Sequence, residues 1–309
     1  MNFTLNVLGT ASAKPTSSRN PSAQVLDVRG RLFLVDCGEG AQRQFCRQRL
    51  SFDRIDAIFI SHIHGDHVFG LPGLLSTIGL ATSRKSIKVF GPQALGAILK
   101  FYLSYYGDQI GIRVDFIPVK TKGPQVIFEN KFLTVEAFPL NHRIETYGYL
   151  FREKTPQLNV RKDAIGRYGL GIAEICSLKN GEDVVRENEI IRSKEVTYLP
   201  YPPRSYAYCS DTAPFPSLAE WVRGVDILYT EATYMADLEK EAAARFHSTT
   251  LQAARLAREA GAKKLVVAHY SSRYRDTAPL LSEIRSVFPN AEAANDGDVY
   301  DVPLVKVDR

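Results

Sequence analysis

Short apolar runs, each bounded by turn-forming residues, recur along the chain and predict β-strands. Segments in which apolar residues return every three or four positions predict helices. Strands dominate the first half, and strands alternate with helices in the second, which favours an α/β fold with sheets covered by helices. The predicted strands are residues 3–8, 23–28, 32–35, 57–60, 87–90, 114–119, 132–137, 206–209, 227–229 and 265–268. The predicted helices are residues 71–80, 92–105, 216–221, 248–259 and 277–287.

One stretch, residues 152–194, departs from this pattern. Its apolar periodicity fades while Gly, Lys and Arg accumulate, as in Arg161-Lys162 and Gly169-Leu170-Gly171. We expect a single domain over residues 1–309, in which residues 152–194 form an inserted flexible arm. A long mobile surface loop is the alternative that composition alone favours.

The composition indicates a globular protein of the cytoplasm. No apolar run approaches the roughly 20 residues that span a bilayer, and the N-terminus alternates like a strand rather than a signal peptide. The four cysteines show no Cys-x-x-Cys spacing, which suits free thiols in a reducing compartment. The formal net charge of +5 is a mild hint of a polyanionic partner.

The strongest chemical signal follows directly after one predicted buried strand. His62, His64, Asp66 and His67 bring three imidazoles and a carboxylate into six consecutive residues. Zinc readily accepts these ligand types, and Gly65 relieves crowding where the loop turns. Without a metal, four such groups packed together would leave unpaired polar atoms and repelling charges. The spacing lets the first two histidines bind one ion while the Asp–His pair faces a second.

Three further candidate ligands also follow predicted strands, where sheet folds usually place site residues. They are His142, Asp211 and His269. Taken singly, either histidine is as readily an ordinary polar residue, and Asp211 is as readily a turn or cap aspartate. Together with the first cluster, they complete two coordination spheres.

Motifs along nearly the whole chain resemble a known family. The His-x-His-x-Asp-His pattern is similar to that of the metallo-β-lactamase superfamily. The match is closest to the ribonuclease Z family, endonucleases that trim the 3′ end of precursor tRNA. Glu-Ala-Thr at 231–233 and His-Ser-Thr at 247–249 are its most specific part. The other motifs are residues 8–10, 15–20, 36–39, 61–67, 70–73, 210–212 and 269–274.

The resemblance implies a four-layer αβ/βα sandwich of the metallo-β-lactamase fold, with an inserted exosite arm. It implies two Zn²⁺ ions per subunit at one edge of the sandwich, although these ligand types also accept Mn²⁺. It further implies a homodimer, in which the arm of one subunit serves the site of the other. One zinc would be held by His62, His64 and His142, the other by Asp66, His67 and His269, with Asp211 bridging the two.

The same resemblance implies the catalytic groups of a zinc phosphodiesterase. Asp66 would orient and deprotonate the attacking water. His247 would donate a proton to the leaving ribose oxygen, with Glu231 holding and charging it. The cut would leave a 3′-hydroxyl on the tRNA. The alternative is that the His-Ser-Thr segment merely opens the helix at 248–259.

For substrate recognition, the resemblance places the arm on precursor tRNA. Basic side chains there would contact phosphates and give a largely sequence-independent, salt-dependent grip. The arm lacks the Gly-Pro-rich segment usual in the family. The candidate substrate-binding residues are Arg161, Lys162 and Arg167 in the arm and Arg19 and Arg273 elsewhere.

Three other functions are open at this point. A glyoxalase-type thioester hydrolase uses the same types of metal ligand, but there the equivalents of His142 and Asp211 lie closer together in sequence. A small phosphodiesterase of the same fold fits every residue named above. A metal-stabilised RNA-binding module without catalysis is disfavoured, because the ligand set is complete.

Overall fold

The strands of the first sheet are buried on both faces. In β3 (Arg31–Cys37), Phe33 and Val35 join one apolar cluster, whereas Leu32 and Leu34 join another. Successive side chains of a strand point to opposite faces, so each face of this sheet packs against a different layer. The first cluster fills the space toward a second sheet, and the other fills the space toward a layer of helices.

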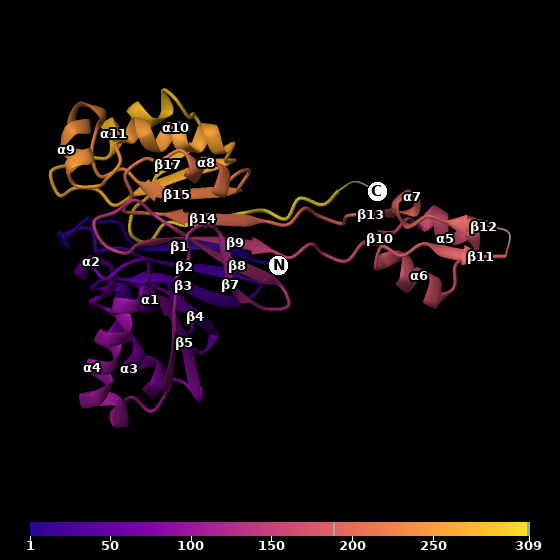
Figure 1. The fold of residues 1–309 in the computed structure, drawn as a ribbon, viewed down its shortest axis with the longest axis horizontal. Helices are drawn as coiled ribbons and strands as arrows, with labels where there is room; N and C mark the ends of the chain where they lie inside the picture. The colour runs from indigo at the N-terminus through magenta and orange to yellow at the C-terminus, as the bar shows by residue number, and fades with distance from the viewer. Residues whose placement is uncertain (188, 308–309) are drawn as a thin grey trace.

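The computed structural model describes residues 1–187 and 189–307. It contains two seven-stranded sheets that lie face to face (Figure 1). The first has the order β18 (Val299–Asp301), β1 (Phe3–Gly9), β2 (Ala23–Val28), β3, β4 (Ile55–Phe59), β5 (Ser86–Gly91) and β6 (Arg113–Pro118). The second has the order β17 (Ala291–Ala293), β16 (Lys264–Ala268), β15 (Ile227–Glu231), β14 (Ser205–Cys209), β9 (Tyr147–Glu153), β8 (Leu133–Pro139) and β7 (Gln125–Glu129).

Helices cover the outer face of each sheet, which gives four layers (Figure 1). The predicted αβ/βα sandwich is confirmed. No helix among the described residues is both long and apolar enough to cross a membrane. The first sheet carries α1 (Ala41–Arg47), α2 (Gly65–Val68), α3 (Leu71–Ala81) and α4 (Gln93–Ile110). The second carries α8 (Ser217–Trp221), α9 (Glu239–Ala244), α10 (Thr250–Ala260) and α11 (Ala278–Arg285).

Every predicted strand and helix overlaps an observed one. In the sandwich, the apolar pattern misses α1, α2, α9, β7, β17 and β18, and also the central strand β9. This strand is buried in the middle of the second sheet, between β8 and β14. Its sequence contains Gly148, and glycine is depleted in strands. A Cβ atom at this position would collide with the ring of Phe138 and lie 2.9 Å from the carbonyl oxygen of Tyr208. Close packing therefore requires the residue that weakens the strand signal.

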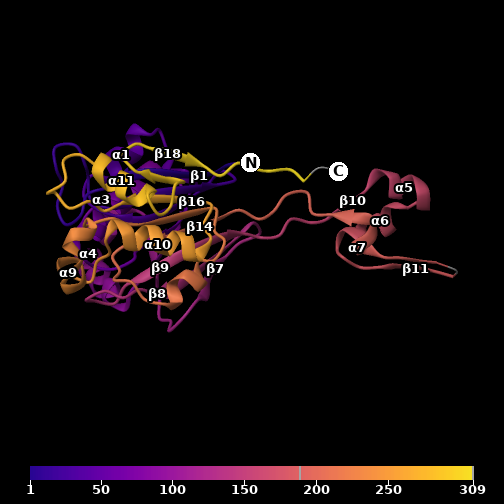
Figure 2. The ribbon, with the colours of Figure 1, turned by 90° about the horizontal axis from the view of Figure 1, so that it is seen from above.

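The stretch predicted as an arm projects from the sandwich on two extended segments (Figures 1 and 2). Contrary to the alternative of a structureless loop, it is folded. Short elements enclose a small apolar core of their own, which includes Val160, Leu178 and Ile191. The periodicity fades because each element is too short to show it. These elements are β10 (Asn159–Val160), α5 (Lys162–Tyr168), α6 (Ile172–Lys179), β11 (Val184–Arg186), β12 (Glu189–Ile191), α7 (Ser193–Val196) and β13 (Thr197–Tyr198).

Candidate metal centre and active site

All seven predicted metal ligands converge at one edge of the sandwich, although they are spread over more than two hundred residues. Four of them lie in the loop after β4 and in α2. The other three lie within three residues of the ends of strands β8, β14 and β16 of the second sheet. Strand ends of both sheets thus meet at the same edge of the sandwich. The ligands there form two groups. The first is His62, His64, His142 and Asp211, and the second is Asp66, His67 and His269.

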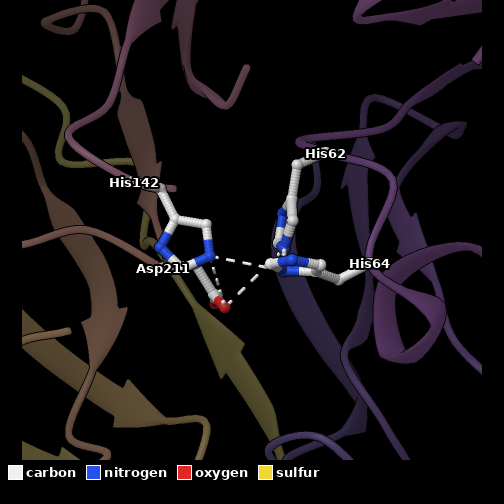
Figure 3. Close-up of side chains that lie close together, drawn as sticks. All are labelled: His62, His64, His142 and Asp211. Carbon is white, nitrogen blue, oxygen red and sulfur yellow. Dashed lines mark hydrogen bonds and ion pairs between the residues drawn. The ribbon is translucent and has the colours of Figure 1, made fainter. Parts of the chain in front are cut away.

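The first group encloses a point that fits a metal ion (Figure 3). His64 Nδ1 lies 2.9 Å from His62 Nε2 and 3.3 Å from His142 Nε2. The Oδ2 atom of Asp211 lies 3.7 Å from His62 Nε2 and 4.0 Å from His142 Nε2. Ligands about 2.1 Å from a tetrahedral ion lie roughly 3.4 Å from one another. Three nitrogens and one oxygen at these separations match a zinc-type donor set.

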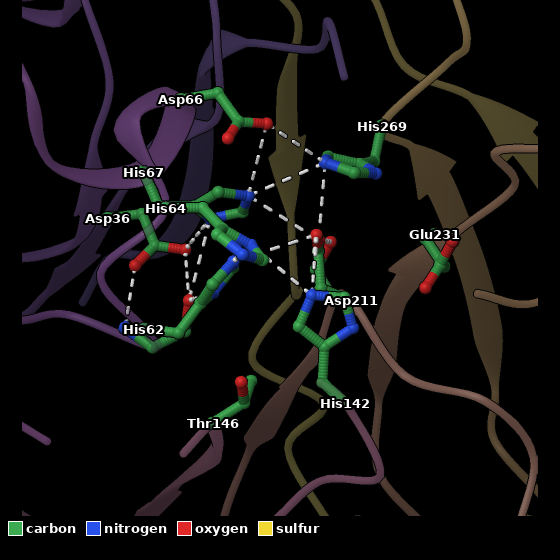
Figure 4. Close-up of polar contacts among 12 residues, drawn as sticks. Asp36, His62, His64, Asp66, His67, His142, Thr146, Asp211, Glu231 and His269 are labelled. Atoms are coloured by element: carbon green, nitrogen blue, oxygen red, sulfur yellow. Dashed lines mark hydrogen bonds and ion pairs between the residues drawn. The ribbon is translucent and has the colours of Figure 1, made fainter. Parts of the chain in front are cut away.

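The second group has the same spacing and shares one carboxylate with the first (Figure 4). His67 Nε2 and His269 Nε2 lie 3.4 Å apart, and Asp66 Oδ2 lies 3.6 and 3.4 Å from them respectively. The Oδ1 atom of Asp211 lies 3.4 Å from His67 Nε2 and 3.2 Å from His269 Nε2. Asp211 therefore presents Oδ2 to one group and Oδ1 to the other, which is the geometry of a bridging ligand.

Backbone strain is concentrated at this centre. Asp36, Asp211 and His269 have φ angles of 56°, 62° and 58°, a left-handed conformation that is uncommon for residues other than glycine. Such conformations each cost of the order of 1–3 kcal/mol and persist only where the surroundings hold them. Two of these residues are predicted ligands, and the third supports a ligand.

Buried polar groups hold the imidazoles in position. The carboxylate of Asp36 accepts hydrogen bonds from His67 Nδ1 at 2.7 Å and from the backbone N–H and hydroxyl of Ser61 at 2.7 and 2.8 Å. Thr233 Oγ1 lies 2.9 Å from His269 Nδ1, and the carbonyl oxygen of Phe246 lies 3.1 Å from His142 Nδ1. Because each Nδ1 atom is engaged in this way, each Nε2 atom is directed at the centre.

The predicted acid pair lies beside the ligands. His247 Nδ1 is 2.9 and 3.1 Å from the two carboxylate oxygens of Glu231, which is fully buried. The same carboxylate accepts hydrogen bonds from the Thr212 N–H, at 2.7 Å, and from the hydroxyl of Thr233. Burial lowers the pKa of His247, but the charge and hydrogen bond of Glu231, together with the charges of Asp211 and Asp66, outweigh it and raise the pKa to about 9. The imidazole is therefore a charged proton donor at neutral pH.

An open cleft of about 740 Å³ is lined by His247 and by five of the seven ligands, His64, Asp66, His142, Asp211 and His269. The backbone N–H of Ala13 donates to Asp66 Oδ2 at 2.7 Å, so the loop after β1 both borders the cleft and holds this carboxylate. Two exposed arginines that the sequence patterns do not single out, Arg143 and Arg245, also line it. Their only sequence signal is proximity to His142 and His247.

The predicted substrate-binding residues are dispersed. Arg19 donates to the carbonyl oxygen of Tyr274 at 3.1 Å and lies over the ring of Tyr270, in the loops that follow β1 and β16. Arg273 lies over the ring of Tyr234.

The arm residues lie at the opposite end of the molecule from α2 and the metal ligands (Figure 1). Arg161, Lys162 and Lys179 line a hollow of about 500 Å³ on the arm, whereas Arg167 lies against Tyr168. The structure thus separates the predicted arm contacts from the ligands of the same chain.

The four-layer fold and the histidine–aspartate centre define a metal-binding hydrolase of the β-lactamase superfamily. In agreement, residues 196–270 match the family model described as a β-lactamase superfamily domain, and residues 3–155 match the model described as anti-Pycsar protein Apyc1. The chain belongs, more narrowly, to the ribonuclease Z family, as its motifs predict.

Whole-chain relatives show this membership. The chain is 42% identical to the ribonuclease Z of Porphyromonas gingivalis, over 95% of this chain and 97% of the relative. It is 41% identical to the ribonuclease Z of Bacteroides fragilis, with the same coverage of both chains. The crystal structure of human tRNase Z, short form, matches with a TM-score of 0.70 and 25% identity, over 97% of this chain and all of that one. The prediction of family and fold is confirmed.

Proposed function

We propose that this protein is a metal-dependent endoribonuclease that removes the 3′ trailer from precursor tRNA and leaves a 3′-hydroxyl on the tRNA. The observation that carries the proposal is the complete ligand set with Asp211 between its two groups, in a chain of the ribonuclease Z family. The pair of His247 with the buried Glu231, beside that set, supplies a proton donor, which an RNA-binding module would not need.

Two zinc ions fit the donor set, and Mn²⁺ is a second candidate because imidazole and carboxylate bind both. One ion would be held by the group that contains His142 and the other by the group that contains His269. When bound, such a pair neutralises charge on the phosphate and lowers the pKa of a water molecule.

The chain's own residues can then move the protons. Asp66, whose Oδ2 is held by the Ala13 N–H, orients the attacking water and accepts its proton. The water oxygen forms a bond to phosphorus as the bond from phosphorus to the 3′ oxygen breaks. His247 delivers its proton to that departing oxygen, and the charge of Glu231 holds the imidazole protonated until then. The trailer leaves with a 5′-phosphate.

We also propose a homodimer in which each arm grips tRNA bound at the partner's site. The arm points away from the metal centre of its own chain, which supports action on another subunit. An apolar stripe on α4 supports association, since Phe101 and Tyr105 are each 68% exposed and Ile98 lies one turn earlier. The charges on the arm balance overall, with seven basic and seven acidic residues between 159 and 198. A phosphate-binding surface on the arm must therefore be local. The hollow lined by Arg161, Lys162 and Lys179, with Asp163 as its one acidic residue, supports such a local surface.

The first test is cleavage of a 3′-extended precursor tRNA by the metal-loaded protein, with S-lactoylglutathione assayed in parallel. We expect one endonucleolytic cut at the 3′ side of the tRNA, lost in Asp66→Ala and in the presence of a chelator. Thioester hydrolysis without RNA cleavage would retain the metal centre and refute the substrate. Sedimentation of the same preparation tests the homodimer.

A further inference from the structure

The two sides of the metal cleft differ in chemistry. Arg143 and Arg245, in loops of the second sheet, make one side basic, and Arg143 is fixed by a 3.0 Å hydrogen bond from Nη2 to the carbonyl oxygen of Ala244. On the side formed by loops of the first sheet, four apolar residues line the cleft beside the ligands His64 and Asp66. They are Ala13, Pro15, Pro21 and Phe69, and the other polar residues on this side are Ser12 and Glu39. A cleft that is basic on one side and apolar on the other suits a ligand with an anionic part and a flat apolar part.

Phe69 is the largest apolar group on that side, and it is 74% exposed. Its neighbours Val68 and Leu71 are buried in the core, so the chain turns this one side chain out of the core and into the cleft. The ring lies against Gly65, where any Cβ atom would collide with it. Glycine between two metal-ligand residues therefore leaves room for a flat ring beside Asp66.

We propose that Phe69 is a substrate-binding residue whose ring stacks on the base of a nucleotide next to the scissile phosphate. This inference rests on the proposed function, because it requires RNA in the cleft. Proteins bind unpaired nucleotides by stacking bases on aromatic side chains and pairing phosphates with arginine. The cleft offers both, because the ring of Phe69 and the side chains of Arg143 and Arg245 line it together with Asp66. Since every base has a π-face, such stacking favours an RNA end without selecting its sequence.

Three substitutions at this exposed position separate stacking from simple apolar contact. Phe69→Ala removes the ring, Phe69→Leu keeps apolar bulk without a π-face, and Phe69→Tyr keeps the ring. We expect kcat/KM for precursor tRNA to fall roughly 5- to 100-fold in Phe69→Ala and nearly as far in Phe69→Leu. We expect Phe69→Tyr to stay within about twofold of the unmodified protein. Metal content, thermal midpoint and sedimentation should be unchanged in all three.

Abasic substrates identify the partner of the ring. Precursor tRNAs that lack the base just before or just after the cut are compared in the unmodified protein and in Phe69→Ala. We expect the penalty of Phe69→Ala to disappear on one of these substrates, as it does when two changes remove the same contact. Equal activity of Phe69→Ala and the unmodified protein, or an equal penalty on both abasic substrates, overturns the inference. A changed sedimentation coefficient in Phe69→Ala also overturns it, by placing the ring in a subunit interface. Failure of the unmodified protein to cut any precursor tRNA would instead refute the proposed function, and this inference with it.

Discussion

The side chain of Arg204 donates two hydrogen bonds to Glu153, from Nε to Oε2 at 2.8 Å and from Nη2 to Oε1 at 3.0 Å. Glu153 is the last residue of β9, and Arg204 immediately precedes β14. The pair therefore joins the two chain segments at the point where the arm leaves the sandwich. Arg29 donates to the same carboxylate at 2.9 Å, and both Glu153 and Arg204 are buried. The base of the arm is thus held by a buried ion-pair network.

Glu153→Gln should destabilise the protein strongly. Removing one partner of a buried pair leaves uncompensated charge, which typically costs about 3–5 kcal/mol. We expect the free energy of unfolding at pH 7, measured by urea titration, to fall by about that amount. The matched control is Glu129→Gln, because Glu129 is paired with Lys154 at the surface, where such pairs contribute little. Equal effects of the two substitutions would mean that the buried network does not hold the arm's base.

The same pair makes stability depend on pH. Burial raises the pKa of Glu153, but the hydrogen bonds and charges of Arg204 and Arg29 outweigh it, so the pKa is lowered in the folded protein. Its contribution is fully present above the unfolded value of about 4.3 and is lost as the pH falls through the lower folded value. We therefore expect the stability gap between the unmodified protein and Glu153→Gln to be constant from pH 7 to 5 and to shrink below pH 4. Unfolding measured with a chelator present excludes metal loss as the cause, and a gap that is as large at pH 3 as at pH 5 contradicts the prediction.

Asp36→Asn should weaken metal binding while sparing the fold. Asp36 supports His67 through Nδ1 and has no place among the ligands themselves. Loss of such a supporting carboxylate typically costs 10- to 100-fold in metal affinity. Competition with a chromophoric chelator would measure the change. Asp226→Asn is the control, since Asp226 is a buried carboxylate that accepts hydrogen bonds from Ser205 away from the centre. An unchanged metal affinity in Asp36→Asn would mean that Asp36 contributes to folding but not to metal binding.

How much of this centre the sequence predicts depends on how local each contact is. His62, His64, Asp66 and His67 lie together in the chain, so their spacing alone indicates a metal site. The supporting contact between Asp36 and His67 spans 31 residues and leaves no pattern in the sequence. The pairing of Glu153 with Arg204 spans 51 residues and likewise leaves no pattern in the sequence.

For the fold, too, the sequence predicts an element only where its pattern is local and long enough to show. Clear apolar periodicity predicts the longer elements, namely helices α3, α4 and α10 and most of the strands that have at least five residues. The arm is predicted as an insertion, but its internal helices and strands are not, because they have two to eight residues each and pack on one another rather than on the sandwich. The strand β9 is not predicted for a different reason. The packing of Phe138 requires Gly148 within this strand, and glycine weakens the strand signal.

His247→Ala should slow turnover by orders of magnitude without emptying the metal centre. The imidazole contacts Glu231 rather than completing the two ligand groups proposed for the ions, so its loss removes a proton donor. General acids of this kind contribute about 10²- to 10⁴-fold to the rate. We expect kcat for precursor tRNA to fall by that range and the metal content, measured by elemental analysis, to stay the same. His142→Ala is the contrast, since it should lose metal and activity together. Full activity in His247→Ala would remove this residue from the mechanism.

The basic hollow of the arm should account for part of the salt dependence of tRNA binding. Each phosphate contact neutralised by Lys or Arg contributes about one unit to the slope of log affinity against log salt. Binding of precursor tRNA is measured in the catalytically impaired His247→Ala protein, with and without alanine at Arg161, Lys162 and Lys179. We expect the triple substitution to weaken tRNA binding and to reduce that slope by two to three units, roughly one per side chain. Anisotropy of a labelled precursor tRNA at several salt concentrations gives both quantities. Arg258→Ala, an exposed arginine on the outer helix α10, is the control that leaves the slope unchanged. If the triple substitution changes affinity equally at every salt concentration, the hollow does not contact phosphates, and the arm must grip tRNA by another surface.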